Sequence, residues 1–147
     1  MNSVHTNVLV PVFFAWLITQ TCKVMVGVIR EKRFDFRWFV GAGGMPSSHA
    51  ATVCSLTTAI GMTDGVNTPL FALSLIFSII VLFDAQGIRR TIGMQANILN
   101  KIVDDIYWKG KIQETRLKEL LGHTPVEVLV GALSGVVIAM VVVYYQR

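Results

Sequence analysis

Long apolar stretches dominate the chain and determine its predicted elements. Residues 8–29 carry a single charge, Lys23, and residues 67–83 and 128–145 carry none. Each stretch is close to the ~20 residues with which an α-helix crosses the hydrocarbon layer of a membrane. A fourth uncharged stretch, residues 38–63, is interrupted in its middle by GAGGMPSSHA, a composition typical of a loop. The pattern predicts an integral membrane protein.

We predict an all-α, polytopic membrane helical bundle that forms one domain over residues 1–147, with about four membrane segments. The segments are expected at Val8–Ile29, Ser47–Gly61, Thr68–Ala85 and Thr124–Tyr145. The second is short for a full crossing, so we expect it to be tilted or partly re-entrant.

A further helix is predicted after the third segment. Apolar residues recur there at intervals of three and four, and polar residues lie off that face. The apolar positions are Ile88, Ile92, Leu99, Ile102 and Ile106. We interpret this stretch as an amphipathic helix lying at the membrane interface. The charged sequence KIQETRLKELLGH then predicts a short helix that ends at Gly122.

The distribution of charged residues along the chain predicts its orientation in the membrane. Only 15% of residues are charged, 53% are hydrophobic, and the net charge is +4. Basic residues form two blocks, residues 30–37 and 89–118, while the connection GMTDGVNTP has no Lys or Arg. By the positive-inside rule, both basic blocks face the cytoplasm. We therefore expect a multi-pass protein of the cell membrane with both termini outside.

This topology brings scattered polar residues to the cytoplasmic level of the membrane. The set comprises Lys23, Arg30, the PSSH turn at residues 46–49, Asp84, Arg89, Arg90 and His123. Ionisable groups inside membranes are costly and are functional candidates by default. The cations and the helix start after Pro46 suit a phosphate, because unpaired N–H groups at a helix N-terminus bind anions. His49 and His123 are the candidate nucleophile and acid–base residues at this level.

These residues resemble a known family. Lys23-x6-Arg30, Pro46-Ser-Ser-His49 and His123-x3-Glu127 are similar, in this order, to the three signatures of the type 2 phosphatidic acid phosphatase and vanadium haloperoxidase superfamily. The stretches DAQGIRRTIG and LLGHTPVEV are most similar to a divergent branch of small membrane proteins in that superfamily.

The resemblance implies a covalent mechanism without metal or cofactor. His123 would attack phosphorus and form a phosphohistidine, and His49 would protonate the departing oxygen and then activate a water. Glu127 would orient the His123 imidazole. The groups that would hold the phosphoryl oxygens are Lys23, Arg30, the Ser47 hydroxyl and the backbone N–H groups of Ser47 and Ser48. Phosphoryl transfer is helped by such positioning and positive charge.

The chain departs from the family pattern at four positions. Glu31 replaces proline, Ser48 replaces glycine, and Glu127 replaces aspartate. The arginine expected six residues before His123 is Leu117, and Arg116 lies one position away. We assign that role to Arg89 and Arg90, which are distant in sequence but expected to lie close in space.

Several residues also have ordinary structural interpretations. Thr124, Pro125 and Glu127 form a helix start with a capping box. Lys23 and the arginines are also explained as groups that extend to the headgroups. Gly131-Ala-Leu-Ser-Gly135 is typical of close helix packing and makes a homodimer a further expectation.

The leading hypothesis is a membrane lipid phosphatase that acts at the cytoplasmic face on a phosphate or diphosphate monoester. A polyprenyl (di)phosphate or a phosphatidate-like phospholipid is the expected substrate, and no nucleic-acid partner is expected. The alternative is a non-catalytic membrane protein or scaffold that binds anionic lipid. A small transporter is a third hypothesis, which four helices accommodate only with oligomerisation.

Overall fold

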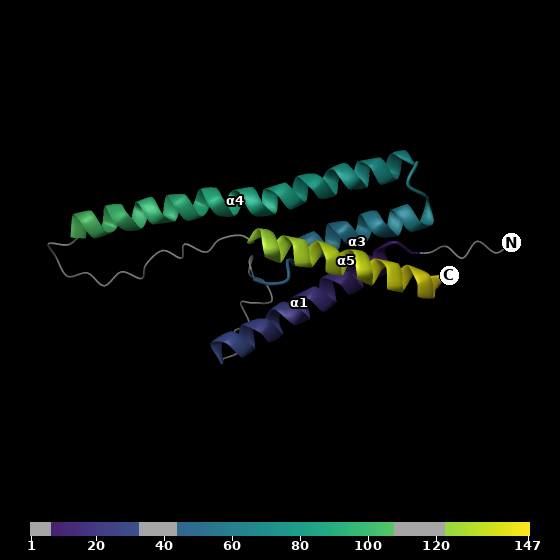
Figure 1. The fold of residues 1–147 in the computed structure, drawn as a ribbon, viewed down its shortest axis with the longest axis horizontal. Coiled ribbons are helices and arrows are strands. Elements are labelled where there is room, and N and C mark those ends of the chain that lie inside the picture. Colours follow the sequence, from purple (N-terminus) through teal and green to yellow (C-terminus); the bar gives the residue numbers. More distant parts are fainter. Residues whose placement is uncertain (1–6, 33–43, 108–122) are drawn as a thin grey trace.

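A computed structural model describes residues 7–32, 44–107 and 123–147, and this part of the chain contains four α-helices and no strand. The helices are α1 (Leu9–Glu31), α3 (Ser48–Thr63), α4 (Pro69–Tyr107) and α5 (Pro125–Gln146). Figure 1 shows them as an elongated bundle from which one end of α4 projects. The all-helical fold class is confirmed.

Three of the helices contain segments that are long and apolar enough to cross a membrane. These segments are Leu9–Ile29, Pro69–Gln86 and Pro125–Gln146. Helix α3 has 16 residues. It therefore extends about 24 Å, less than the ~30 Å of a hydrocarbon core. Three of the four predicted spans are thus supported, and the fourth, at α3, is not confirmed as a span.

Helix α4 is the main difference from the predicted elements. It runs without interruption through 39 residues, a length of about 58 Å. Within the described residues, the predicted third segment and the predicted amphipathic helix are thus one helix, and a separate interfacial helix is not confirmed. The apolar spacing after Ile88 suits either arrangement, and the chain has no proline at the junction to end the first helix.

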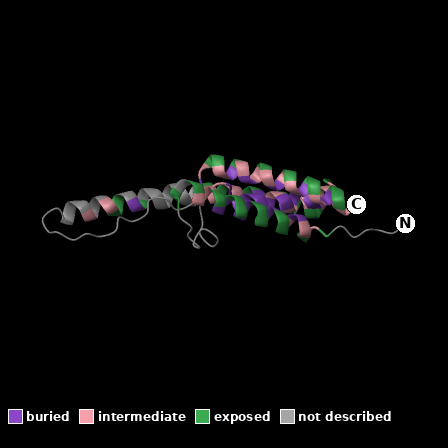
Figure 2. Cartoon of the chain, turned by 90° about the horizontal axis from the view of Figure 1, so that it is seen from below, coloured by how far each residue is buried: buried purple, intermediate pink, exposed green. Residues whose placement is uncertain are grey.

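Helix α3 lies at the centre of the bundle. It contacts α1, α4 and α5, whereas α1 and α4 do not contact each other within the described residues. Figure 2 shows buried residues concentrated where the helices meet and exposed residues on the outer faces. Many of the buried side chains are small, with Ala15, Ala50, Ala51, Ala59 and Ala139 among them. Small residues let helix backbones approach closely, which is a principal source of helix association in membranes.

Two glycines of α5 mark the closest approach between helices. A Cβ added at Gly131 would lie 2.3 Å from the Ser47 carbonyl oxygen, and one at Gly135 would lie 2.2 Å from that of Ala51. The small-residue pattern of α5 therefore serves packing inside one chain. The helix face from which we predicted a homodimer is therefore already covered by α3 of the same chain.

Helices α3 and α4 are joined by hydroxyl groups. The Thr57 and Ser78 hydroxyl oxygens lie 2.7 Å apart. Ser78 also donates to the carbonyl of Val53, and Thr57 to that of Ser74, both at 3.0 Å. These contacts fix the register of the two helices within the apolar region.

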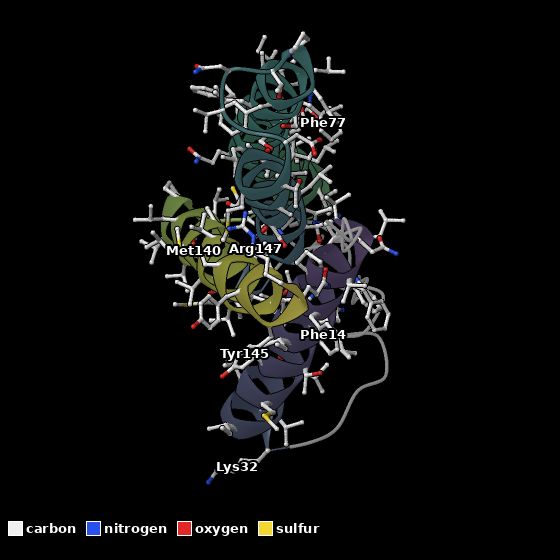
Figure 3. All side chains as sticks on the ribbon, turned by 90° about the vertical axis from the view of Figure 1, so that its right-hand side faces the viewer. Phe14, Lys32, Phe77, Met140, Tyr145 and Arg147 are labelled. Carbon is white, nitrogen blue, oxygen red and sulfur yellow. The ribbon has the colours of Figure 1, made fainter. Side chains whose placement is uncertain are left out.

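The outer faces carry large apolar side chains. In Figure 3, Phe77 of α4 and Met140 of α5 point away from the bundle, and both are about half exposed. Exposed aromatic and aliphatic groups on three long helices are what contact with lipid tails requires. At the end of the bundle opposite the polar groups, the Arg147 side chain donates to the carbonyl of Met62 near the end of α3.

Candidate functional site

The start of α3 forms one half of the candidate site. Ser47 is the N-cap, with an extended backbone, and its hydroxyl accepts a hydrogen bond from the Ala50 N–H at 3.4 Å. Pro46, immediately before it, has no N–H and limits the helix start. The helical pattern provides no acceptor for the N–H groups of Ser48 and His49. Within the described residues, these two N–H groups can therefore act as donors to an anion at the helix N-terminus.

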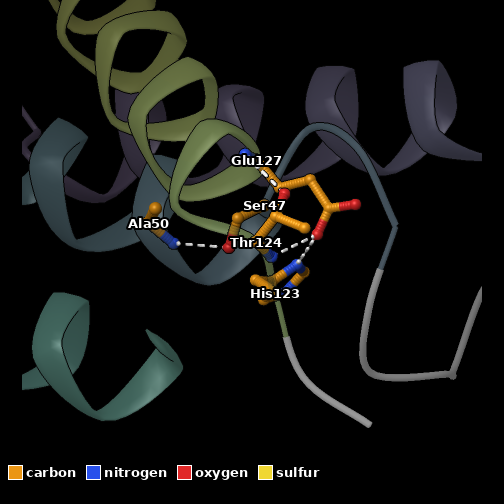
Figure 4. A network of polar contacts seen from close by, with 5 residues as sticks. All are labelled: Ser47, Ala50, His123, Thr124 and Glu127. Atoms are coloured by element: carbon orange, nitrogen blue, oxygen red, sulfur yellow. Dashed lines mark hydrogen bonds and ion pairs between the residues drawn. The ribbon is translucent and has the colours of Figure 1, made fainter. Parts of the chain in front are cut away.

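The start of α5 forms the other half, and its predicted capping box is confirmed. The Glu127 carboxylate accepts from the Thr124 N–H at 2.7 Å, and the Thr124 hydroxyl accepts from the Glu127 N–H at 3.2 Å. Pro125 occupies the first turn. Figure 4 shows this network with His123 directly beside the carboxylate.

Backbone hydrogen bonds join these two helix starts to each other and to α4. The Ser47 N–H donates to the Glu127 carbonyl at 3.0 Å, and the His123 N–H donates to the Ala85 carbonyl at 3.4 Å. The Ser47 N–H is therefore used inside the protein and is not free for the phosphate-binding role that we predicted for it. Sequence reasoning missed this bond because it joins two segments with no local signal.

His123 is the most enclosed titratable group of the site. Its side chain is buried, and Nδ1 lies 3.5 Å from the Glu127 Oε2. Neither ring nitrogen has a hydrogen-bond partner within the described part of the chain. Burial lowers the pKa of His123, the Glu127 carboxylate opposes this, and His49 and Lys23 lower it further. The lowered pKa favours the neutral imidazole, which is the form that a nucleophile or a base requires.

His49 meets His123 as the topology predicted. The two ring centroids are 6.0 Å apart and the ring planes meet at 61°, an edge-to-face contact. His49 is exposed, whereas His123 is buried. The pair therefore combines one fixed imidazole with one that is accessible from outside the bundle.

Lys23 brings positive charge to the same place from α1. Its side chain is buried, and its stem runs beside Gly44, where an added Cβ would lie 3.3 Å from the lysine Cγ. Gly44 also has a φ of +90°, a conformation that favours glycine. After burial and the other histidine, the positive charge of Lys23 also lowers the pKa of His123.

The structure gives only the helix positions of three of the four candidate arginines. Arg30 lies in the last turn of α1, and Arg89 and Arg90 lie in α4 beyond Ala85, but their side chains are outside the described residues. Arg116 lies outside them altogether. The described site thus unites His49, Ser47, Ser48, Lys23, His123 and Glu127.

Comparisons with known proteins place the chain in a family of membrane proteins. No solved structure matches the chain. The chain is 39% identical over 142 residues to the uncharacterised membrane protein YuiD of Bacillus subtilis (strain 168), and the match covers 89% of this chain and 90% of YuiD. The Divergent PAP2 family matches residues 4–138, which contain α1, α3 and α4 and the first part of α5. The protein is a multi-pass membrane member of the divergent PAP2 family.

Proposed function

We propose that this protein is a lipid phosphatase that hydrolyses a phosphate or diphosphate monoester through a phosphohistidine intermediate. The observation that carries the proposal is the contact between His49 and His123, with ring centroids 6.0 Å apart, beside Lys23 and the first turn of α3. A helix N-terminus, a buried cation and two imidazoles form a set suited to phosphoryl transfer. Membership of the divergent PAP2 family supports the same reaction class.

His123 is the proposed nucleophile. With Nδ1 facing the Glu127 carboxylate, the imidazole proton is best placed on Nδ1, which leaves the Nε2 lone pair for phosphorus. Attack forms the N–P bond and breaks the P–O bond to the lipid. The proton on His49 passes to the departing oxygen, so the lipid leaves as an alcohol, or as a monophosphate when the substrate is a diphosphate.

Hydrolysis of the intermediate returns the site to its starting state. His49, now neutral, takes a proton from a water whose oxygen attacks phosphorus. The N–P bond breaks, inorganic phosphate leaves, and His123 is regenerated. Because the two rings touch in this structure, phosphate entry requires His49 to turn outward, and its exposed position permits this.

The oxyanion charge is balanced by several groups. Lys23 and the N–H groups of Ser48 and His49 are the described donors for the phosphoryl oxygens, and Arg30, Arg89 and Arg90 are proposed to supply the remaining charge. Preorganised donors of this kind stabilise charge that develops in the transition state. No metal is needed when protein cations supply this charge.

The substrate is proposed to be a membrane lipid with a terminal phosphate, such as a polyprenyl (di)phosphate or a phosphatidate-like phospholipid. The site lies near Gln86, where the apolar segment of α4 ends, and near Pro125, where the apolar segment of α5 begins. A phosphate there would have its tail in the bilayer. The distribution of basic residues favours the cytoplasmic face.

The test is phosphate release from lipid phosphates by the purified protein. His123→Ala is expected to abolish turnover, while His5→Ala, which removes a histidine far from the site in sequence, retains it. Full activity of the His123→Ala variant would remove the proposed nucleophile.

The alternative function is binding of an anionic lipid without catalysis. The observation that favours it is the internal use of Ser47, whose N–H and hydroxyl oxygen are both engaged within the protein. Saturable binding of a lipid phosphate, with no phosphate release from any substrate tested, would support this alternative over the enzyme.

A further inference from the structure

Helix α3 exposes side chains although it lies at the centre of the bundle. Its buried positions alternate with half-buried or exposed ones, and all of the latter except Met62 form two stripes on opposite faces. The His49 stripe consists of His49, Thr52, Leu56 and Thr63. The Cys54 stripe consists of Cys54, Thr58 and Gly61. Spacings of three, four and seven keep each stripe on one side of the helix.

The packing of α3 shows which helices border each stripe. Its Ser47 and Ala51 lie against α5, and its Val53 and Thr57 lie against α4. Helix α1 contacts both α3 and α5 but not α4 within the described residues. The His49 stripe therefore faces the opening between α1 and α4, and the Cys54 stripe faces the line where α4 meets α5.

Contacts with α4 border the Cys54 stripe at both ends: one joins α4 to the residue before Thr124, and the other joins α4 to Gly61 of the stripe itself. Near the candidate site, the His123 N–H donates to the Ala85 carbonyl of α4. At the other end of α3, the Phe71 ring lies so close to Gly61 that an added Cβ would be 2.9 Å from it. No contact of either kind joins α1 to α4 within the described residues. The opening beside the His49 stripe is thus the side on which the bilayer reaches α3.

We propose that one hydrocarbon tail of a phosphate-headed lipid lies along the His49 stripe, having entered from the bilayer between α1 and α4. The inference rests on the phosphate site proposed above, because His49 is both the accessible histidine of that site and the first residue of the stripe. From His49 to Thr63 the stripe extends roughly 21 Å along the helix axis. A head at the start of α3 and a tail along its exposed face form one continuous track.

This arrangement predicts how activity depends on tail length. In a series of lipid phosphates with one tail, kcat/KM increases as the tail covers more of the stripe, because each methylene leaves water or disordered lipid for a fixed surface. The increase ends when the extended tail reaches about 21 Å, the length of the stripe. An increase that continues well beyond this length would contradict the proposed track.

Two threonines of α3 provide a matched pair of substitutions. Thr52 lies on the His49 stripe and Thr58 on the Cys54 stripe, and each hydroxyl donates to the carbonyl four residues earlier, at 2.7 and 2.8 Å. Thr52→Trp is expected to lower kcat/KM for a long-tailed substrate, relative to a short soluble phosphate monoester, by about tenfold or more. Thr58→Trp leaves this ratio unchanged. Equal ratios in the two variants, or a loss confined to Thr58→Trp, would overturn the proposal.

A second measurement needs neither a variant nor turnover. The wild-type protein in bilayers is irradiated with a lipid phosphate that carries a diazirine in its tail, and in parallel with the same lipid ending in an alcohol. The phosphate probe is expected to label Thr52 and Leu56 of the His49 stripe several-fold more than the alcohol probe. Equal labelling by the two probes, or preferential labelling of Phe71 and Cys54, would contradict the track. Because this readout is independent of hydrolysis, it separates failure of the track from failure of the proposed enzyme activity.

Discussion

Replacement of either α5 glycine by alanine gives a quantitative test of the packing around the site. The added Cβ would lie 2.3 Å from the Ser47 carbonyl oxygen at Gly131 and 2.2 Å from that of Ala51 at Gly135. Ordinary contact needs about 3.5 Å, so α3 and α5 must separate by roughly 1 Å in each variant. Overpacking costs about 1–3 kcal/mol, and the better helix propensity of alanine returns up to about 1 kcal/mol. We expect a net loss of stability of about 1–2 kcal/mol in both.

The two variants are expected to differ in activity. Gly131 faces Ser47, whose N–H bonds the Glu127 carbonyl and whose helix carries His49. A shift there separates the two histidines, and a 1 Å misplacement of reacting groups costs about 10²-fold in rate. Gly135 lies one turn farther from the site, so Gly135→Ala retains most of its activity.

Stability would be measured by titration of the purified protein with dodecyl sulfate in mixed micelles, followed by the helical circular dichroism signal. Activity would be measured as phosphate release from a lipid phosphate. Leu133→Ala is the matched control, because Leu133 lies between the two glycines on the exposed side of α5. Unchanged stability in both glycine variants, or equal loss of activity in both, would refute this reasoning.

Three further predictions follow from the polar contacts. Glu127→Gln keeps a group able to cap α5, but removes the carboxylate that raises the pKa of His123. Because a nucleophilic imidazole must be neutral, the acid limb of the pH–rate profile is expected to move to lower pH, with kcat reduced about 10²- to 10⁴-fold. Burial lowers the pKa of His123 below its unfolded value, so the unfolded chain binds more protons in the interval between the two values. The stability of the wild-type protein in dodecyl sulfate titrations should therefore rise with pH across that interval. Below the interval, the contribution that His123 makes to this stability is lost. Alanine substitutions of Thr57 and Ser78, alone and together, should show a coupling energy of about 0.6 kcal/mol in the same titrations, and purely additive effects would contradict a direct contact.

Much of the bundle follows from local patterns in the sequence. The spans at 8–29 and 124–145 were predicted within a few residues of α1 and α5, because long uncharged stretches specify membrane helices directly. The capping box at Thr124 was predicted because its residues are neighbours in the chain. The meeting of His49 and His123 followed from topology, since both lie at helix ends that the charge pattern assigns to one side.

The parts that were missed depend on contacts between distant segments. Nothing local distinguishes an interfacial helix after Ile88 from a continuation of α4, since both satisfy the same periodicity. The bond from the Ser47 N–H to the Glu127 carbonyl is between backbone groups, which carry no residue preference. The spacing of Gly131 and Gly135 predicted close packing, but the pattern alone does not reveal whether the partner helix belongs to the same chain.

The most direct test of the central claim is to trap the phosphorylated histidine. The protein is incubated with a lipid carrying a radiolabelled phosphate, quenched in alkali and digested, and the labelled peptide is identified by mass spectrometry. We predict an acid-labile, alkali-stable phosphate on His123 that accumulates in the His49→Ala variant, because the water that hydrolyses the intermediate is no longer activated. Absence of label in that variant, with phosphate binding intact, or label on another residue, would contradict the proposed mechanism.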